Sequence, residues 1–169
     1  EMFAAEFARM CEDAGADMIT IHGRSRRMMY DGVPHYEEIA QAKAAVSIPV
    51  IANGWINSVS DAERVMEITG ADGVMLARYA LENPFVIRDL TGVPYEKSFL
   101  EVMLEQLSLA LLYYDETFAL RYVRCIAANG MKKRRGTKKY KEGLYRAGSV
   151  GELKEILELI FGEEPASAT

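Results

Sequence analysis

Three short polar clusters in the first half of the sequence carry side chains that could bind a phosphate and the ring attached to it. They are residues 22–26, which include His22 and Arg24, and the stretches Asn53-Gly54-Trp55 and Ala77-Arg78-Tyr79. An Asn-Gly pair allows left-handed backbone angles, so successive N–H groups can point at one anion. An arginine at the next strand end can add a fork of donors to the same phosphate. We therefore expect the second and third clusters to hold a phosphate, and His22 and Arg24 to donate hydrogen bonds to a reacting ring nearby.

Each cluster also has a purely structural interpretation. A histidine at the end of a strand more often completes the structure than takes part in catalysis. Asn-Gly alone is only a turn signal, and a single arginine such as Arg78 can form a surface ion pair. The functional interpretation gains weight because all three clusters follow predicted strands. They converge at one edge if those strands are parallel neighbours.

The elements expected around the clusters alternate between strand and helix. Three apolar segments are typical of buried strands, at residues 18–21, 48–52 and 73–77. Helices are predicted from their apolar spacing or their caps at residues 3–14, 36–45 and 60–69. Ser60 and Glu63 have the pattern of a capping box for the last of these helices. The spacing fits a doubly wound sheet or part of a (β/α)8 barrel, and a complete barrel needs about 250 residues.

The second half of the sequence predicts a different kind of domain, because its apolar segments have helical length and spacing. Helices are expected at residues 99–114, 118–128 and 150–161. The boundary is expected at residues 91–95, and residues 163–169 are expected to form a flexible tail.

Charge is distributed unevenly along the chain. The net charge is −5, yet residues 121–146 contain 10 basic residues and a single acid, Glu142. Seven of the ten residues in 132–141 are Lys or Arg. Such a dense block repels itself, which favours an anionic partner such as a phosphate backbone. The alternative is a solvated basic face on a helical bundle.

Composition disfavours several other classes of protein. No apolar run approaches the roughly 18 residues that could span a membrane. Cys11 and Cys125 lie far apart without a CxxC partner or a nearby histidine, so we expect no metal site and interpret both as small fillers on helices. In the absence of a signal peptide we expect a reducing cytoplasm. The sequence opens at Glu1 inside a helical pattern, so we expect it to be part of a longer protein.

Most of residues 6–92 resemble the later barrel strands of the tRNA-dihydrouridine synthase family. The most specific part of the resemblance is His-Gly-Arg-Ser-Arg at residues 22–26, followed by Tyr30 and Gly32. The resemblance implies an α/β fold, namely the C-terminal part of a (β/α)8 TIM barrel with about three βα units, followed by an all-helical domain. Residues 1–92 would be a partial FMN-binding barrel, and residues 95–162 a helical tRNA-binding domain.

The same resemblance implies site residues in both domains. The expected cofactor-binding residues are His22, Arg24, Asn53, Gly54, Trp55, Ala77 and Arg78. The expected RNA-binding residues are Arg26, Arg124, Lys132, Lys133, Arg134, Arg135, Lys138, Lys139 and Lys141. Tyr140 or Tyr145 would stack on bases.

The activity that the resemblance implies is reduction of uridine in tRNA to 5,6-dihydrouridine, with FMN as cofactor and NADPH as electron donor. The family's catalytic cysteine lies on an earlier strand, and neither Cys11 nor Cys125 matches its sequence context. We therefore assign no catalytic residue and expect the chain alone to be inactive. The chain also departs from its relatives, which usually have Asp at the position of Trp55 and glycines at those of Ala77 and Tyr79.

Two other functions remain as alternatives. The first is a different FMN-dependent TIM-barrel oxidoreductase that acts on a small molecule, which would not explain residues 22–26 or the basic helical extension. The second is a non-catalytic RNA-binding module that uses the barrel strands as a scaffold. A flavin absorbance spectrum would separate the enzymes from the module, and a tRNA gel shift would separate the RNA binders from the small-molecule enzyme.

Overall fold

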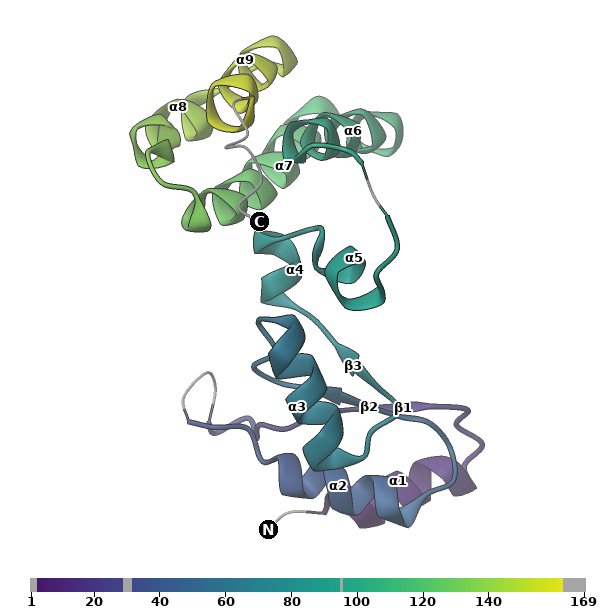
Figure 1. Ribbon diagram of the computed structural model, residues 1–169. Coiled ribbons are helices and arrows are strands. Elements are labelled where there is room, and N and C mark those ends of the chain that lie inside the picture. The colour runs from purple at the N-terminus through teal and green to yellow at the C-terminus, as the bar shows by residue number, and fades with distance from the viewer. Residues whose placement is uncertain (1–2, 29–31, 95, 163–169) are drawn as a thin grey trace. The chain divides into compact units, whose positions relative to one another are not determined.

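The computed structural model describes residues 3–28, 32–94 and 96–162. The predicted tail at 163–169, and Tyr30 of the family resemblance, lie outside the described residues. The chain divides into two compact units, residues 1–79 and residues 80–169 (Figure 1).

The first unit contains a parallel sheet of three strands with helices between them, which confirms the predicted α/β arrangement. Its elements are α1 (Ala4–Asp13), β1 (Ile19–His22), α2 (Tyr36–Ala45), β2 (Val50–Asn53), α3 (Val59–Thr69) and β3 (Gly73–Met75). The strand order is β1-β2-β3, and both neighbouring pairs are parallel. In this register His22 lies opposite Asn53, which in turn lies opposite Met75. The three polar clusters therefore begin at the same edge of the sheet.

The two faces of this sheet have different surroundings. Helices α1, α2 and α3 pack against one face, where Val50 and Ala52 of β2 are fully buried (Figure 1). Alternate residues point to the other face, because side chains along a strand alternate. That face carries Thr20, His22 and Met75, all of which are exposed. In a closed barrel, the face opposite the helices is the interior.

The start of α3 differs from the prediction that Ser60 caps it. The N-cap is Ser58, whose extended backbone (φ −158°) lets its hydroxyl accept a hydrogen bond from the Asp61 N–H at 3.0 Å. The Asp61 carboxylate in turn accepts the Asn57 N–H at 3.0 Å. Two overlapping Ser-x-x-acid patterns are present, and the earlier one forms the cap. The predicted helix end is correct, because Gly70 follows it in the left-handed conformation (φ 64°).

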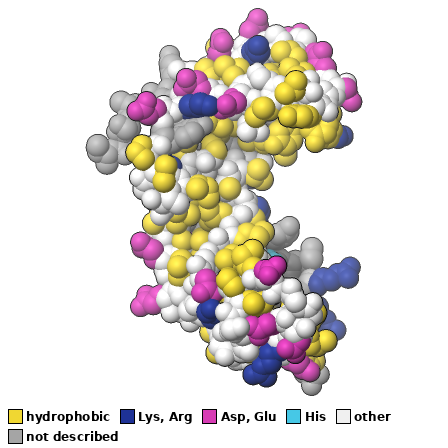
Figure 2. Space-filling model, turned by 90° about the vertical axis from the view of Figure 1, so that its right-hand side faces the viewer, with side chains coloured by type: hydrophobic (Ala, Val, Ile, Leu, Met, Phe, Trp, Pro, Cys, Tyr) yellow, Lys and Arg dark blue, Asp and Glu magenta, His cyan; other side chains and the backbone are white. Residues whose placement is uncertain are grey.

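The described residues of the second unit form helices around one apolar core. The elements are α4 (Arg78–Glu82, which begins at the end of the first unit), α5 (Val86–Thr91), α6 (Phe99–Tyr113), α7 (Glu116–Gly130), the 3-10 helices η1 (Met131–Lys133) and η2 (Thr137–Tyr140), α8 (Lys141–Arg146) and α9 (Val150–Phe161). Leu107, Val123, Leu144 and Leu157 are fully buried in the core that α6 to α9 share. Hydrophobic side chains also gather on the surface of this unit (Figure 2), and α6 exposes Leu112.

The division between the units falls earlier than the expected boundary at residues 91–95. Phe85, which precedes α5, packs edge-on against Phe99 of α6, with ring centroids 6.2 Å apart. Residues 80–94 therefore associate with the helices that follow them. Within the described part of the chain, no helix is both long enough and apolar enough to cross a membrane.

Candidate functional site

A cavity of about 170 Å³ lies at the carboxyl ends of the three parallel strands. It is lined by all the residues expected to bind a cofactor: His22, Arg24, Asn53, Gly54, Trp55, Ala77 and Arg78. Ile56, Asn57, Met75 and Tyr79 complete the lining. The cavity is smaller than the roughly 300–1,000 Å³ typical of complete ligand pockets, so its size suits one phosphate group better than a whole nucleotide.

Asn53 joins the three strand ends to one another. Its side-chain Nδ2 donates to the carbonyl of Met75 at 2.6 Å, which links β2 to β3. Its backbone carbonyl accepts the Gly23 N–H at 2.9 Å, which links β2 to the residue after β1. The amide side chain thus links β2 to β3 at the floor of the cavity by a bond that a shorter or apolar residue could not make, whereas the bond to Gly23 uses the backbone alone.

The hydrogen bond that His22 makes determines which of its ring nitrogens faces away from the sheet. Its Nδ1 lies 3.2 Å from the carbonyl oxygen of Asn53. A carbonyl can only accept, so Nδ1 carries the proton in this bond, and Nε2 of the neutral ring is an acceptor. His22 can then donate from Nε2 to a ligand carbonyl only as the imidazolium.

The turn after β2 has a backbone conformation that favours glycine. Gly54 has φ 137° and Trp55 has φ 47°, so two successive residues have positive φ. A Cβ on Gly54 would lie 3.2 Å from the Pro34 Cβ and 3.3 Å from His22 Nδ1, so only glycine fits this position without displacement.

Tyr36 supports this turn from beneath and was not predicted as a site residue. Its side chain is buried, and its hydroxyl donates to the Gly54 carbonyl at 2.9 Å. Burial raises the pKa of Tyr36, while the nearby Arg64 guanidinium opposes that change. The sequence predicts Tyr36 only as the first residue of a helix, and the structure confirms that position. No local pattern links it to a turn 18 residues later.

The two arginines of the cavity are arranged differently. Arg24 donates from Nη2 and Nε to the Gly32 carbonyl, at 2.9 and 3.3 Å, and its guanidinium lies 5.6 Å from the centre of the Trp55 ring. It therefore fixes the loop after β1 and packs on the indole. Arg78 follows β3 and lies on the cavity wall with its side chain exposed. Together these residues give the cavity two positive charges and a backbone turn, which fit a bound phosphate.

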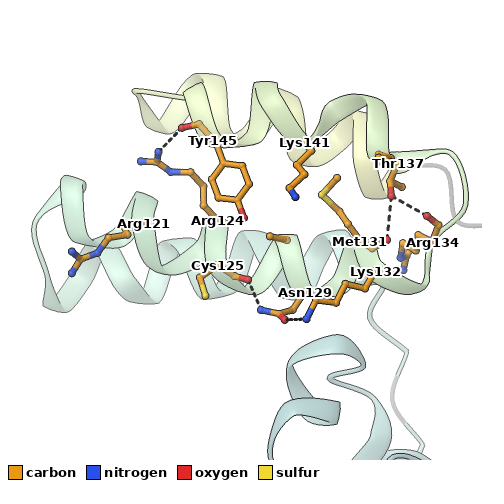
Figure 3. Close-up of a pocket in the computed structure, with 12 residues that line it drawn as sticks. Arg121, Arg124, Cys125, Asn129, Met131, Lys132, Arg134, Thr137, Lys141 and Tyr145 are labelled. Atoms are coloured by element: carbon orange, nitrogen blue, oxygen red, sulfur yellow. Dashed lines mark hydrogen bonds between the residues drawn. The ribbon is translucent and has the colours of Figure 1, made fainter. Parts of the chain in front are cut away.

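A second and larger cavity, of about 610 Å³, lies within the second unit between α7 and the η2–α8 segment (Figure 3). Five predicted RNA-binding residues line it: Arg124, Lys132, Arg134, Lys138 and Lys141. Arg121, Asn129 and Tyr145 also line it. Arg121 and Asn129 were not among the expected site residues, although on α7 Arg121 lies three residues before Arg124 and Asn129 lies four residues after Cys125, which also lines the cavity.

The remaining predicted RNA-binding residues have other positions. Lys139 lies over the ring of Tyr140, with Nζ 4.7 Å from its centre. Arg135 is exposed, and Arg26 is exposed in the first unit after β1. The side chain of Lys133 lies outside the described residues. The block at 132–141 is therefore spread over several directions.

Arg134 also lines this second cavity, which we call the basic cavity, but its guanidinium is turned toward the core. It lies 4.8 Å from the centre of the Phe99 ring and 5.0 Å from that of Phe161. Cation–π contacts of this kind stabilise the fold. Of the two tyrosines expected to stack on bases, Tyr145 lines the cavity, whereas Tyr140 packs against the core.

Among the described residues, no group of three His, Cys, Asp or Glu is placed to hold a metal ion.

Comparison with known proteins shows a family match over almost the whole chain. The family model described as "Dihydrouridine synthase (Dus)" matches residues 1–163. The "Probable tRNA-dihydrouridine synthase 1" of Synechocystis sp. is 38% identical over 169 residues, which cover 94% of this chain and 47% of the relative. The "tRNA-dihydrouridine synthase B" of Pseudomonas syringae pv. tomato is 37% identical over 126 residues, covering 69% of this chain and 37% of the relative. The protein of the same name from Vibrio cholerae is 46% identical over 83 residues, covering 49% and 26%. The chain thus spans about half the length, or less, of these relatives.

Proposed function

The chain belongs to the dihydrouridine synthase family, and on that premise we propose that it takes part in reducing uridine in tRNA to 5,6-dihydrouridine, with FMN as cofactor and NAD(P)H as electron donor. Enzymes of this family generally depend on a flavin. In this proposal the first unit, residues 1–79, belongs to the FMN-binding TIM barrel that was expected at residues 1–92, and residues 95–162 form a helical tRNA-binding domain. The protein works on tRNA in the cytoplasm.

One observation carries the FMN half of the proposal. Residues at or just after the ends of three strands, selected from the sequence for phosphate and ring chemistry, line one cavity at the carboxyl ends of those parallel strands. Barrel enzymes bind ligands at that end of the strands, and phosphate sites frequently follow the last two of them. The cavity has room for a phosphate, and the exposed face carrying His22 and Met75 adjoins it.

Different side chains contact different parts of the cofactor in this proposal. Arg78 and the Gly54 turn hold the phosphate, and Arg24 with Trp55 closes one side of the cavity. His22 would meet the flavin ring through Nε2, because its Nδ1 is bonded to the Asn53 carbonyl. A bound flavin supplies hydride transfer, which no amino-acid side chain provides.

The chain does not itself supply the proton donor in this proposal. Cys11 belongs to α1, which covers the opposite face of the sheet from His22, and Cys125 belongs to α7 in the second unit. Neither lies at a strand end. We expect the purified chain, given FMN, NADPH and unmodified tRNA, to form no dihydrouridine.

The FMN site is tested by comparing two flavins that differ only in the phosphate. Titration of the chain into FMN and into riboflavin, followed by flavin fluorescence, should show tighter binding of FMN by about tenfold, as the loss of charge-assisted hydrogen bonds predicts. Arg78→Gln should abolish this preference by weakening FMN alone. Arg88→Gln is the matched control, because Arg88 is an exposed arginine that pairs with Asp89 and is not among the residues that line the cavity. Equal affinity for the two flavins would contradict the phosphate site.

A further inference from the structure

We propose that the basic cavity of the second unit takes up a single unstacked nucleobase of an RNA, with the neighbouring phosphates held by the cations at its rim. The proposal rests on the proposed function, which has the helical domain bind tRNA. The proposal adds a site for one base to the phosphate contacts that the helical domain is proposed to make. This site is separate from the cavity at the strand ends.

The shape of the cavity suits a base. Its volume of about 610 Å³ lies within the range of sites that enclose a small ligand. Its walls include Ala128 and the buried Met131, which present apolar surface. Tyr145 reaches from α8 toward α7 across the opening (Figure 3), and its side chain is 52% exposed. An aromatic ring held at the mouth of an apolar hollow is the arrangement on which unpaired bases stack.

Basic side chains surround the cavity. Arg124 is held in place because its Nη1 donates to the Tyr145 carbonyl at 2.9 Å and its Nε to the Leu120 carbonyl at 3.0 Å. Lys138 and Lys141 approach from the opposite side and are exposed. Figure 3 shows Lys141 pointing from α8 toward α7. A nucleotide whose base occupies the hollow therefore has positive charge on both sides of its phosphates.

The cavity also offers polar atoms for the edge of a base. Asn129 Oδ1 accepts from Lys132 Nζ at 2.7 Å, and Asn129 Nδ2 donates to the Cys125 carbonyl at 2.8 Å. An amide oxygen has two lone pairs and an amide nitrogen has two protons, so each atom has the capacity for one more hydrogen bond. An acceptor and a donor side by side match the edge of any base.

This chemistry favours unpaired RNA over both duplex RNA and an acidic peptide. Bases in a duplex remain stacked and paired, and only a base that has left the stack can enter a hollow between two helices. An acidic peptide would satisfy the cations but has no planar group to stack on Tyr145. Substitution of Tyr145 therefore distinguishes binding of unpaired RNA from binding of duplex RNA or of an acidic peptide.

The test uses the 169-residue chain and two labelled RNAs of about twelve nucleotides, one an oligouridylate and one a blunt duplex, in fluorescence anisotropy titrations at one salt concentration. Tyr145→Ala should weaken binding of the oligouridylate about tenfold, as expected for loss of one base–aromatic stack, and leave the duplex unchanged. Tyr145→Phe should keep the wild-type affinity for both, because the ring remains.

Tyr113→Ala is the matched control, since Tyr113 is a 74% exposed tyrosine on α6 outside the cavity. The inference is overturned if Tyr145→Ala binds the oligouridylate like the wild type, if Tyr113→Ala has the same effect as Tyr145→Ala, or if an oligoglutamate peptide displaces the oligouridylate at equal concentration. The double substitution Lys138→Gln and Lys141→Gln distinguishes a failure of the base site from a failure of the proposed tRNA binding. If it weakens both RNAs while Tyr145→Ala weakens neither, tRNA binding stands without the base site; if neither variant matters, both proposals fail.

Discussion

Gly54 lines the cavity at the strand ends and lies close to Pro34 and His22. Its φ of 137° is rare for a residue with a side chain, and an added Cβ would press on Pro34 and His22. We expect Gly54→Ala to lower the free energy of unfolding by about 1–3 kcal/mol, measured by urea denaturation. The same variant should lose the preference for FMN over riboflavin.

Gly70→Ala provides the comparison for Gly54. Gly70 also has positive φ (64°), but an added Cβ there would meet nothing within 4 Å. It should destabilise the protein by about 1 kcal/mol through backbone strain alone and leave flavin binding unchanged. If the two variants behave alike in both assays, the close approach at Gly54 has no functional consequence.

Tyr36 gives a prediction that depends on pH. Burial raises its pKa above the ordinary value of 10.0. Between the ordinary and the raised pKa the unfolded chain loses the Tyr36 proton while the folded chain keeps it. The contribution of Tyr36 to stability is therefore fully present below about pH 10 and is lost as the pH rises through the folded-state pKa. Tyr36→Phe should abolish this alkaline loss.

The same substitution has an effect at neutral pH. Removing the hydroxyl leaves the Gly54 carbonyl without the Tyr36 donor, which should cost about 1 kcal/mol in the free energy of unfolding. Tyr113→Phe, on an exposed ring, should cost nothing measurable. A neutral-pH effect for both variants, or for neither, would show that the Tyr36–Gly54 hydrogen bond does not stabilise the turn.

The cavity residues were accessible from the sequence because they lie at or shortly after the carboxyl ends of strands, where position along the chain determines position in space. His22, Asn53 and Arg78 come together for that reason. Tyr36 was missed because its partner is set by how α2 packs under the sheet, and that hydrogen bond has no local signature. Arg134 was grouped with the other cations because the sequence does not show that Phe99 and Phe161 lie beneath it.

At the scale of elements, two serines that are two residues apart have different roles at the start of α3. Ser58 makes the capping hydrogen bond, whereas Ser60 lies inside the first turn. We expect Ser58→Ala to lower the free energy of unfolding by about 1 kcal/mol and Ser60→Ala to change it by less than about 0.5 kcal/mol. Thermal and urea denaturation of the two variants measure the difference. A larger loss of unfolding free energy for Ser60→Ala than for Ser58→Ala would indicate that Ser60 is the cap, as the sequence suggested.

Two helices have the boundaries that the sequence predicted. The helices at 36–45 and 150–161 have the expected ends, and Ser149 caps the second of them by accepting the Glu152 N–H. The strands were less well defined: β3 ends at Met75 although the apolar run continues to Ala77. Strand length depends on the register with a neighbour, and β3 pairs with β2 only over residues 73–75.

At the scale of the whole molecule, the two units have different electrostatic character, which the net charge of −5 conceals. The parallel order of the three strands was predicted and is confirmed. The sequence had suggested strands that are apolar on both faces, but the face away from the helices carries Thr20 and His22. Barrel interiors near the ligand end are the usual place for such polar side chains in a parallel sheet.

The basic segment at 132–141 is not a single patch, and this changes how it should be tested. Substituting Arg134 would remove cation–π contacts to Phe99 and Phe161 and so confuse a defect in binding with a defect in stability. Lys138 and Lys141 are exposed and line the basic cavity, so their charge can be removed with little effect on the core.

The most direct test of the central claim, that this chain engages tRNA through its helical domain, is the salt dependence of tRNA binding by the wild type and by the Lys138→Gln, Lys141→Gln double variant. Each phosphate that a lysine neutralises releases condensed counterions, so affinity should fall linearly on a log–log plot against salt concentration. The double variant should bind more weakly, with a slope shallower by about 1.4, because each lysine that neutralises a phosphate of single-stranded RNA contributes about 0.7 to the slope. Lys154→Gln, on the exposed side of α9, should match the wild type. A folded double variant with unchanged affinity and slope would contradict the account.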